Sequence, residues 1–283
     1  MDNRKHAYLI ITHANFDYLK LLIKKLDSPN NDFFVLIDKK SKCDLLSLKM
    51  SVSLSKIFIV KRMKIYWGDY SQIKAEMLLF QNAVKQNHYS YYHLLSGVDI
   101  ILKSKEEIFS FFDENAGYEF VEVNSRQESG KYHNRLRYFF FFEKGKSREK
   151  GKLRYFLNQL SLHIQYFIGT DRLRNKPFVY KGSNWVSITD EFANYIVNNF
   201  KKYKHMFKYS TCGDAMFVQT LIMDSPFKDK VYPKGNLRKI DWKRGRPYSW
   251  QEKDFDELMS SGCLFARKIE NSSLYNKIFN AID

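Results

Sequence analysis

The sequence predicts an α/β fold, in which a β-sheet is flanked by helices on its faces. Short, continuous apolar runs alternate with segments whose apolar residues recur at helical spacing. The connections between these segments are short, as in βαβ units. A chain of 283 residues with 44% hydrophobic residues can bury a sizeable core, and no repeat or linker divides it. We therefore expect a single domain over residues 1–283.

Residues 1–124 carry the clearer pattern of strands and helices. Buried strands are expected at residues 7–12, 33–37, 57–60 and 91–95, and the segment 120–123 closes this half. A helix follows the first strand, because its apolar residues keep the spacing of a single helical face: Leu19, Leu22, Ile23 and Leu26. Asp69 can cap a second helix, with Gln72 three residues later, and residues 108–112 lie in a third helix.

Residues 125–283 are less regular. The segment 125–180 is rich in Arg, Lys, Phe and Tyr, and we expect it to form loops and helices that shape an acceptor groove. Strands are expected at residues 182–188 and 237–242, with a final element at 264–269. Helices are expected at residues 191–200, 213–223 and 254–259.

Polar segments follow three of the expected strands, at residues 12–15, 38–40 and 96–99. Ligands of α/β sheets bind at the carboxyl ends of the strands, so these segments mark the expected binding edge. No G-x-G-x-x-G follows the first strand and no G-x-x-x-x-G-K-[ST] occurs in the chain. These absences argue against a dinucleotide-binding site and a P-loop.

The chain is strongly basic, with 47 Lys+Arg against 31 Asp+Glu and a net charge of +16. Such an excess indicates an anionic partner, which can be nucleic acid, anionic lipid or a phosphorylated small molecule. No helix-turn-helix, zinc-finger or RNP pattern supports nucleic acid. The densest basic cluster, residues 135–152, encloses Phe139–Phe142 and suits the interface of an anionic membrane. A core strand of phenylalanines followed by a solvated basic loop is the slightly favoured alternative.

Other composition features exclude further classes. The three cysteines, Cys43, Cys212 and Cys263, are far apart and form no C-x-x-C pair, which argues against a disulfide scaffold and a zinc ribbon. His13 and His93 have no carboxylate at ligand spacing, so no metal site is expected. No run approaches the ~18 apolar residues of a transmembrane helix, and the first residues do not read as a secretory signal. We expect a cytoplasmic protein, attached at most to the inner face of the cell membrane.

Eight segments together resemble the core-2/I-branching β-1,6-N-acetylglucosaminyltransferase family, which includes the protein O-xylosyltransferases. They occur in the family's order and span nearly the whole chain: residues 7–13, 34–40, 67–71, 93–99, 182–185, 212–220, 236–242 and 264–268. No single segment is diagnostic, but the ordered set is specific. The length and the missing membrane anchor resemble the bacterial members.

The resemblance implies a GT-A-type fold, a mixed sheet flanked by helices, with a nucleotide-sugar half at residues 1–124 and an acceptor-binding and catalytic half at 125–283. It also implies inverting transfer from a UDP-sugar with no metal at the diphosphate and no cofactor. Ser96-Gly97-Val98-Asp99 stands where an Asp-x-Asp would be, with Asp99 as its one acid. Fixed cations must then stabilise the leaving group. By resemblance these are Lys268 and either Arg244 or Arg246.

Further roles follow from the resemblance, residue by residue. Ile11 and Asp38 fall where the family holds the uridine. Glu122 and Trp242 fall where it holds the acceptor sugar, and Trp185 lies in a segment that we assign to the substrate side. Each of these residues also has a plain structural role open to it, such as core packing, a turn or a solvated strand end, and only the joint pattern favours the functional roles.

The position of the catalytic base holds an alanine. An inverting transfer needs a group that takes the proton of the attacking hydroxyl, and the family supplies a glutamate at the start of a helix. Alignment on Phe217 and Gln219-Thr220 places Ala215 at that position, beside Asp214. One residue along a helix turns a side chain by ~100°, so Asp214 is expected to face elsewhere.

Two origins of Ala215 compete. It can be a deliberate replacement of a natural glutamate, made to trap a substrate complex, or a natural departure in which Asp214 serves or activity is lost. The otherwise intact donor site favours the first origin. In either case this sequence is expected to bind a UDP-sugar and to transfer it very slowly, since losing a general base typically costs ~10²–10⁴ in rate.

The leading prediction is a glycosyltransferase that builds a surface glycan, with N-acetylglucosamine as the first candidate sugar and xylose, galactose or galactofuranose as others. Its partners would be a UDP-sugar and a glycan or lipid-linked saccharide acceptor, with peripheral contact to an anionic membrane and no nucleic acid. A UDP-sugar-binding pseudoenzyme, favoured by Ala215, and a basic nucleic-acid-binding protein, favoured by charge alone, are the alternatives.

Overall fold

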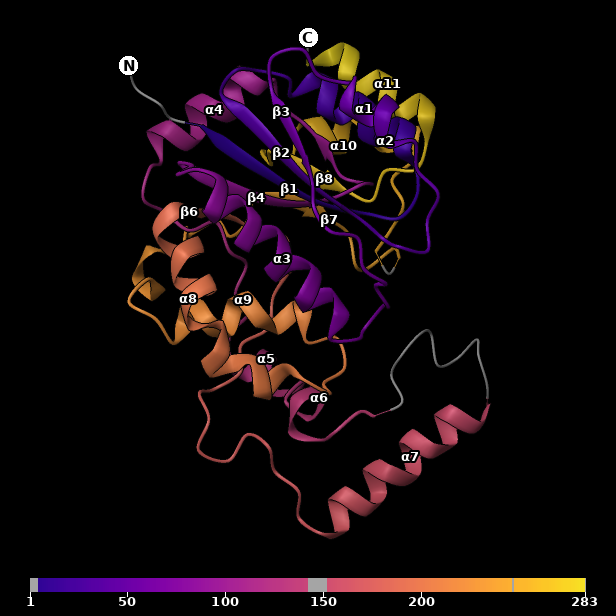
Figure 1. Ribbon diagram of the computed structural model, residues 1–283, viewed down its shortest axis with the longest axis vertical. Helices are drawn as coiled ribbons and strands as arrows, with labels where there is room; N and C mark the ends of the chain where they lie inside the picture. Colours follow the sequence, from indigo (N-terminus) through magenta and orange to yellow (C-terminus); the bar gives the residue numbers. More distant parts are fainter. Residues whose placement is uncertain (1–4, 142–151, 246, 283) are drawn as a thin grey trace.

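The main sheet has five strands in the order β3-β2-β1-β4-β6. The computed structural model describes residues 5–141, 152–245 and 247–282 (Figure 1). The four parallel strands are β1 (His6–Thr12), β2 (Asn31–Ile37), β3 (Lys56–Ile59) and β4 (Tyr91–Ser96). The edge strand β6 (Ser187–Thr189) runs antiparallel to β4. The predicted α/β fold with a mixed sheet is confirmed.

Strand side chains alternate between two cores, one on each face of the sheet. Leu9 and Phe34 point to one face, and Ile10 and Phe33 point to the other. The first face is covered by α3 (Ser71–Gln86), α8 (Asp190–Phe207) and α9 (Asp214–Met223). The second is covered by α1 (Phe16–Lys25), α4 (Lys105–Glu114) and α11 (Ser272–Ala281) (Figure 1). Burial on both faces explains why the strands are continuous apolar runs.

A second, three-stranded sheet has the order β5-β8-β7. Its strands are β5 (Ile100–Ile101), β7 (Arg238–Ile240) and β8 (Phe265–Arg267), and the turn η2 (Glu252–Asp254) and helix α10 (Phe255–Met259) lie between β7 and β8 in the chain. The backbone N–H of Ile269 donates to the carbonyl of Val98 at 3.0 Å. This sheet therefore carries residues 265–269 back to the loop that follows β4.

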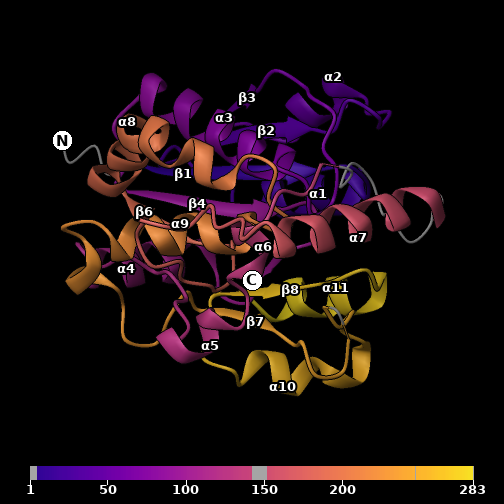
Figure 2. The ribbon, with the colours of Figure 1, turned by 90° about the horizontal axis from the view of Figure 1, so that it is seen from below.

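The remaining elements are short, except for one helix. They are α2 (Leu45–Lys49), α5 (Arg126–Gly130), α6 (Asn134–Arg137), α7 (Lys152–Phe167) and η1 (Lys228–Lys230). Figure 1 shows α7 standing apart from the sheet at the bottom of the view, and Figure 2 shows it from below, along one side of the molecule.

Several predicted elements need correction. The strand expected at 182–188 is limited to Ser187–Thr189. The carbonyl of Val186 still accepts from the backbone N–H of Leu94 in β4 at 2.8 Å, but Gly182 donates to the carbonyl of Ala215 in α9 and packs on Glu122. No phenylalanine strand forms at residues 139–141, where Phe141 is exposed; residues 142–151 of the basic cluster lie outside the described residues. Helix α11 was not predicted, although its buried Leu274, Tyr275, Ile278 and Phe279 keep helical spacing.

Candidate functional site

The carboxyl ends of β1, β2 and β4 meet at one edge of the sheet, as the polar segments predicted. The backbone N–H of Asp38 donates to the carbonyl of Thr12 at 2.9 Å, and that of Gly97 donates to the carbonyl of Ile11 at 3.0 Å. A Cβ atom on Gly97 would lie 2.2 Å from Thr12 Oγ1, so only glycine allows this approach. Ile11 and Asp38, the predicted uridine contacts, therefore lie beside the 96–99 loop.

Asp38 is buried and ends β2 with a tight turn. Its Oδ1 accepts from the backbone N–H of Lys40 at 2.9 Å, and its Oδ2 lies 3.2 Å from Lys40 Nζ. The turn role foreseen as the alternative for Asp38 is thus present. It does not exclude the predicted uridine contact, because a carboxylate has about four acceptor sites.

Asp99 is buried at the centre of a small charged cluster. Its carboxylate accepts from the backbone N–H of Ser96 at 2.8 Å and from Ser96 Oγ at 2.7 Å. Arg267 Nη1 forms an ion pair with the same carboxylate at 3.0 Å. The guanidinium carbon of Arg267 also lies 4.2 Å from the centre of the Trp185 ring, a cation–π contact. Asp99 and Trp185, both predicted site residues, are therefore linked through Arg267.

Arg267 itself was not predicted, since its neighbour Lys268 fitted the family's pattern. Lys268 Nζ forms an ion pair with Glu270 at 2.8 Å. Arg244 contacts three carboxylates, Asp241, Asp254 at 3.1 Å and Glu257 at 2.8 Å. Arg246 lies outside the described residues. Contact of Lys268 or Arg244 with a diphosphate stays a prediction, and each would have to release acidic partners to make it.

The predicted base position lies beside the predicted acceptor residue. Helix α9 begins at Asp214, and the carbonyl of Ala215 accepts from the backbone N–H of Gly182 at 3.0 Å. Gly182 in turn packs on the backbone of Glu122, where an added Cβ would lie only 1.8 Å from the Glu122 carbonyl oxygen. Burial raises the pKa of Glu122, and the charge of Lys181 opposes this shift. Trp242, the other predicted acceptor residue, is 60% exposed.

Asp214, the residue before the predicted base position, contacts α3. Its Oδ2 accepts from Gln72 Nε2 at 3.1 Å. Burial raises the pKa of Asp214, while the positive charges of Arg135 and Arg267 lower it. That Asp214 is turned away from the base position stays a prediction.

Glu76 of α3 is a functional candidate that was not predicted from the sequence. It is fully buried; Asn184 Nδ2 donates to its Oε1 at 3.3 Å, and its Oε2 has no hydrogen-bond partner among the described residues. Burial, and then the charge of Asp214, raise the pKa of Glu76 well above its usual value. The sequence pattern that could have identified Glu76 is an acidic residue at helical spacing from the apolar Ile73 and Phe80, on the face expected to be buried.

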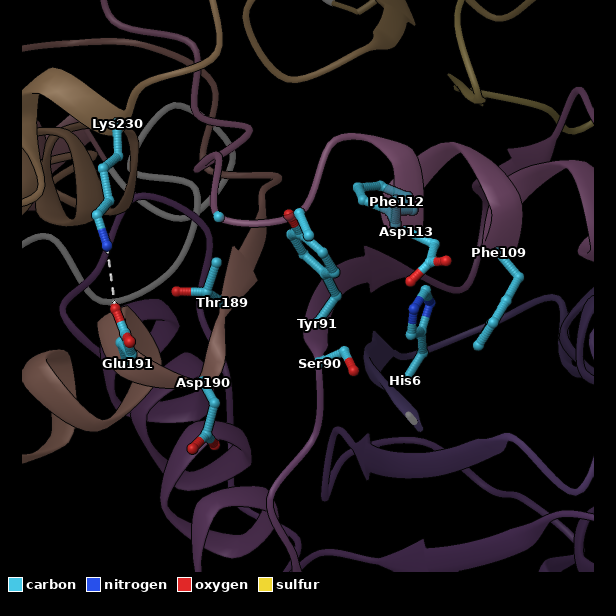
Figure 3. Close-up of a pocket in the computed structure, with 12 residues that line it drawn as sticks. His6, Ser90, Tyr91, Phe109, Phe112, Asp113, Thr189, Asp190, Glu191 and Lys230 are labelled. Atoms are coloured by element: carbon cyan, nitrogen blue, oxygen red, sulfur yellow. Dashed lines mark hydrogen bonds and ion pairs between the residues drawn. The ribbon is translucent and has the colours of Figure 1, made fainter. Parts of the chain in front are cut away.

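Two cavities are found near this sheet, one at its opposite edge and one beside the turn that contains Asp38 and Lys40. One of about 380 Å³ opens at the amino ends of β1 and β4, where Figure 3 shows His6, Tyr91 and Phe112 on one side and the Lys230–Glu191 pair, at 3.0 Å, on the other. Burial lowers the pKa of His6 to about 3, so this ring is neutral. Since ligands of such sheets bind at the opposite edge, we do not assign the donor to this cavity.

The second cavity, of about 360 Å³, lies beside the start of α3. Its lining combines aromatic rings with lysines: Tyr66, Tyr70, Phe141, Tyr209, Lys64 and Lys208. Within residues 5–141, 152–245 and 247–282, no three His, Cys, Asp or Glu side chains converge as a metal would need. In that same part of the chain, no helix combines the length and apolarity required to cross a bilayer.

Comparison with known proteins identifies the family. The profile of the Core-2/I-Branching enzyme family matches residues 6–261. N-acetyllactosaminide beta-1,6-N-acetylglucosaminyl-transferase of Mus musculus is 23% identical over 93% of this chain and 68% of its own length. Xylosyltransferase 2 of Canis lupus familiaris is 21% identical over 98% of this chain, which spans only 33% of that relative.

Among solved structures, the apo form of mouse Xyloside xylosyltransferase 1 aligns with a TM-score of 0.44 and 10% identity, over 93% of this chain and 96% of that one. The family match covers most of the sequence, including every segment that builds the edge described above up to the start of β8. The chain belongs to the Core-2/I-branching enzyme family and is a glycosyltransferase by descent.

Proposed function

We propose that this protein is built to transfer a sugar from a UDP-sugar to a hydroxyl of a glycan acceptor, with inversion and without a metal at the diphosphate. The support is family membership, the position of Ile11 and Asp38 at the carboxyl edge of the sheet, and the contact of Ala215 with Gly182, which packs on Glu122. N-acetylglucosamine is the first candidate sugar and xylose the second, because the relatives' names contain these two sugars.

In the proposed reaction the acceptor oxygen attacks C1 of the donor sugar. A new C1–O bond forms while the bond between C1 and the phosphate oxygen breaks, and the electron pair of that bond leaves with UDP. The proton of the acceptor hydroxyl passes to a base. The protein must therefore supply positive charge at the leaving diphosphate and a proton acceptor at the hydroxyl.

Positive charge is available at the donor edge. Arg267 lies against Asp99 and Trp185, and Lys268 follows it directly. Glu270 holds Lys268 in the absence of donor, and a diphosphate carries more charge than a single carboxylate. We propose that the donor displaces Glu270 from Lys268, while Asp99 keeps Arg267 in place.

The proton acceptor is the part that this chain lacks. Ala215 has no titratable group, and the carboxylate of Asp214 contacts Gln72 on α3. A glutamate at 215, projecting from the first turn of α9 next to Gly182 and Glu122, would extend from the place where the acceptor is proposed to bind. We therefore expect the protein as it stands to bind donor and to turn over very slowly.

The observation that carries this proposal is the position of Ala215, and its test is restoration of a base. Ala215→Glu is expected to raise UDP release from a UDP-sugar in the presence of acceptor by ~10²–10⁴-fold. Ala215→Gln is the matched control, because it has the same shape without a proton-accepting carboxylate, and it should stay near the rate of the parent.

A sugar-nucleotide-binding pseudoenzyme is the second candidate, favoured by the same alanine. It predicts that Ala215→Glu binds UDP-sugar but releases UDP no faster than Ala215→Gln does. Equal rates for the glutamate and glutamine variants, with donor binding intact, would replace the transferase proposal with this one.

A further inference from the structure

Helix α7 presents its apolar side to solvent. Five large apolar residues lie on one face and are 46–82% exposed: Leu153, Phe156, Leu160, Ile164 and Phe167. At 100° per residue these positions fall within one narrow stripe of the helix. The opposite side carries Asn158 and Gln165, which are each only 6% exposed. The arrangement is the reverse of an ordinary surface helix, whose apolar stripe faces the core.

Hydrogen bonds fix this orientation. Gln165 Oε1 accepts from the backbone N–H of Phe139 at 2.7 Å, and Gln165 Nε2 donates to the carbonyl of Phe139 at 3.0 Å. Just after the helix, Arg172 Nη1 donates to the carbonyl of Tyr138 at 3.0 Å and Nη2 to that of Met206 at 3.2 Å. The polar side of α7 is therefore bound to the body of the protein, and its apolar stripe has no partner within the described residues.

A basic aromatic cleft adjoins the helix. Phe139, which Gln165 holds, stacks on Phe141 with ring centres 5.4 Å apart, and Phe141 lies 5.5 Å from Tyr209. Phe141 and Tyr209 line the 360 Å³ cavity, whose lysines are Lys64, Lys74 and Lys208. All three lysines are exposed. The cluster of cations thus adjoins the polar side of α7, through Gln165 and the stacked aromatic rings, and the apolar stripe lies on the opposite side of the same helix.

We infer that α7 and the adjoining lysine cleft form a surface that docks on an anionic lipid bilayer, with the apolar stripe in the interface and the lysines on the headgroups. A helix with exposed Leu, Phe and Ile beside aromatic rings and cations fits the boundary between headgroups and acyl chains. Charge also favours lipid as the partner. Two copies of this chain would each carry a net charge of +16 and repel one another, whereas an anionic bilayer attracts the lysines and accommodates the apolar stripe. The docking rests on α7 itself; its use, delivery of the enzyme to a lipid-linked acceptor, rests on the proposed function.

Vesicle co-sedimentation of the full chain tests this inference. Wild-type protein is expected to bind vesicles of 30% phosphatidylglycerol in phosphatidylcholine and to bind pure phosphatidylcholine weakly. Phe156→Gln/Ile164→Gln should reduce binding by about tenfold or more, because two exposed anchors lose their apolar surface. Lys64→Glu/Lys74→Glu/Lys208→Glu should reduce it by about 100-fold, since each lysine near an anionic surface contributes about 1 kcal/mol.

Matched controls change the same chemistry elsewhere. Leu46→Gln/Leu54→Gln replaces two other exposed apolar residues, and Lys49→Glu/Lys85→Glu/Lys253→Glu replaces three other exposed lysines. The leucine control is expected to bind like wild type. The lysine control should lose much less binding than the cleft variant, because its lysines lie on other elements.

Three results would overturn the inference. The first is that wild type does not bind anionic vesicles, and the second is that test and control variants lose equal amounts of binding. The third is that light scattering shows a dimer, that Phe156→Gln/Ile164→Gln converts this dimer to a monomer, and that the variant still binds vesicles. The last result would assign the stripe to a second copy. Vesicle binding is measured without nucleotide and UDP binding without vesicles, so failure of the docking surface is separable from failure of the proposed transferase.

Discussion

Glu76 shows how a single buried carboxyl affects both stability and the site. Its side chain lies in the core against α9, with Oε2 unpartnered among the described residues and Asp214 nearby. An isolated carboxylate is costly to bury, so the folded protein favours the neutral acid. Because neutral Glu76 is next to Asp214, this corner of the site carries less negative charge than its two carboxyl groups would suggest.

The raised pKa of Glu76 predicts a stability that falls with pH. Below the ordinary glutamate pKa both folded and unfolded chains hold the proton, and the contribution is complete. As the pH rises toward the folded-state pKa, the unfolded chain ionises first and the contribution is lost. Glu76→Gln cannot ionise, so its melting temperature relative to wild type should rise by about 3 °C or more between pH 5 and pH 8, at roughly 2–4 °C per kcal/mol.

Thermal melts of both proteins between pH 5 and pH 8 measure this difference. Glu114→Gln, at an exposed position of α4, is the control and should track wild type across the range. If the difference in melting temperature between Glu76→Gln and wild type is the same at every pH, Glu76 is not held neutral in the folded protein.

Gly182 is the residue on which the contact between Glu122 and α9 depends. The atom that an added Cβ would strike is a backbone oxygen, which cannot turn aside as a flexible side chain can. Gly182→Ala is therefore expected to destabilise the protein by about 1–3 kcal/mol, seen as a lower melting temperature, and to weaken acceptor use in the Ala215→Glu background. Gly130→Ala is the matched control, since a Cβ there meets nothing within 4 Å. Equal melting temperatures of the two variants would refute the close packing at 182.

At the scale of elements, the sequence predicts the strands and helix starts whose pattern is continuous and whose contacts are between neighbours in the chain. The strands β1, β2 and β4 are uniform apolar runs, and runs this short and this apolar are typical of strands buried on both faces. The turn before α3 is also local, since Asp69 Oδ1 accepts from the backbone N–H of Ser71 at 2.8 Å, but the N-cap is Tyr70 and not Asp69 as predicted. The polar segments after these strands converge as expected.

Elements defined by distant partners are not predictable in this way. Residues 182–185 have strand-like composition, but their hydrogen bonds go to α9, to Glu76 of α3 and to Asn236, which no local pattern reveals. The role of Arg267 was missed for a similar reason, because only the pairing of β8 with β5 brings Arg267 onto Asp99. The outward stripe of α7 reads in the sequence like any buried stripe, and only Gln165 bound to Phe139 sets its direction.

At the scale of the whole molecule, the net charge of +16 could serve either a polyanion or a small ligand such as the proposed UDP-sugar. Many cations are engaged within the fold: Arg244 with three acids, Lys268 with Glu270 and Arg267 with Asp99. A uniform electrostatic attraction to polyanions is therefore not what the described site is built for. In the proposed function, Arg267 and Lys268 serve a single nucleotide diphosphate instead.

Calorimetry distinguishes these two uses of charge. UDP is expected to bind at one site per chain at physiological salt, whereas a random oligonucleotide should bind weakly and lose most of its affinity as salt rises, because that binding depends on counterion release. Arg267→Met should weaken the binding of UDP and leave that of the oligonucleotide almost unchanged. Tight oligonucleotide binding without any heat from UDP would favour a nucleic-acid-binding protein.

The return of β8 to the loop after β4 has a consequence for biosynthesis. Asp99 and its partner Arg267 are 168 positions apart in the chain. Val98 and its hydrogen-bond partner Ile269 are similarly distant in the sequence. At translation rates of about 5–20 residues per second, the loop emerges from the ribosome roughly 10–30 s before the arginine that completes it. The nascent polypeptide therefore carries Asp99 without its cation partner until Arg267 has been synthesised.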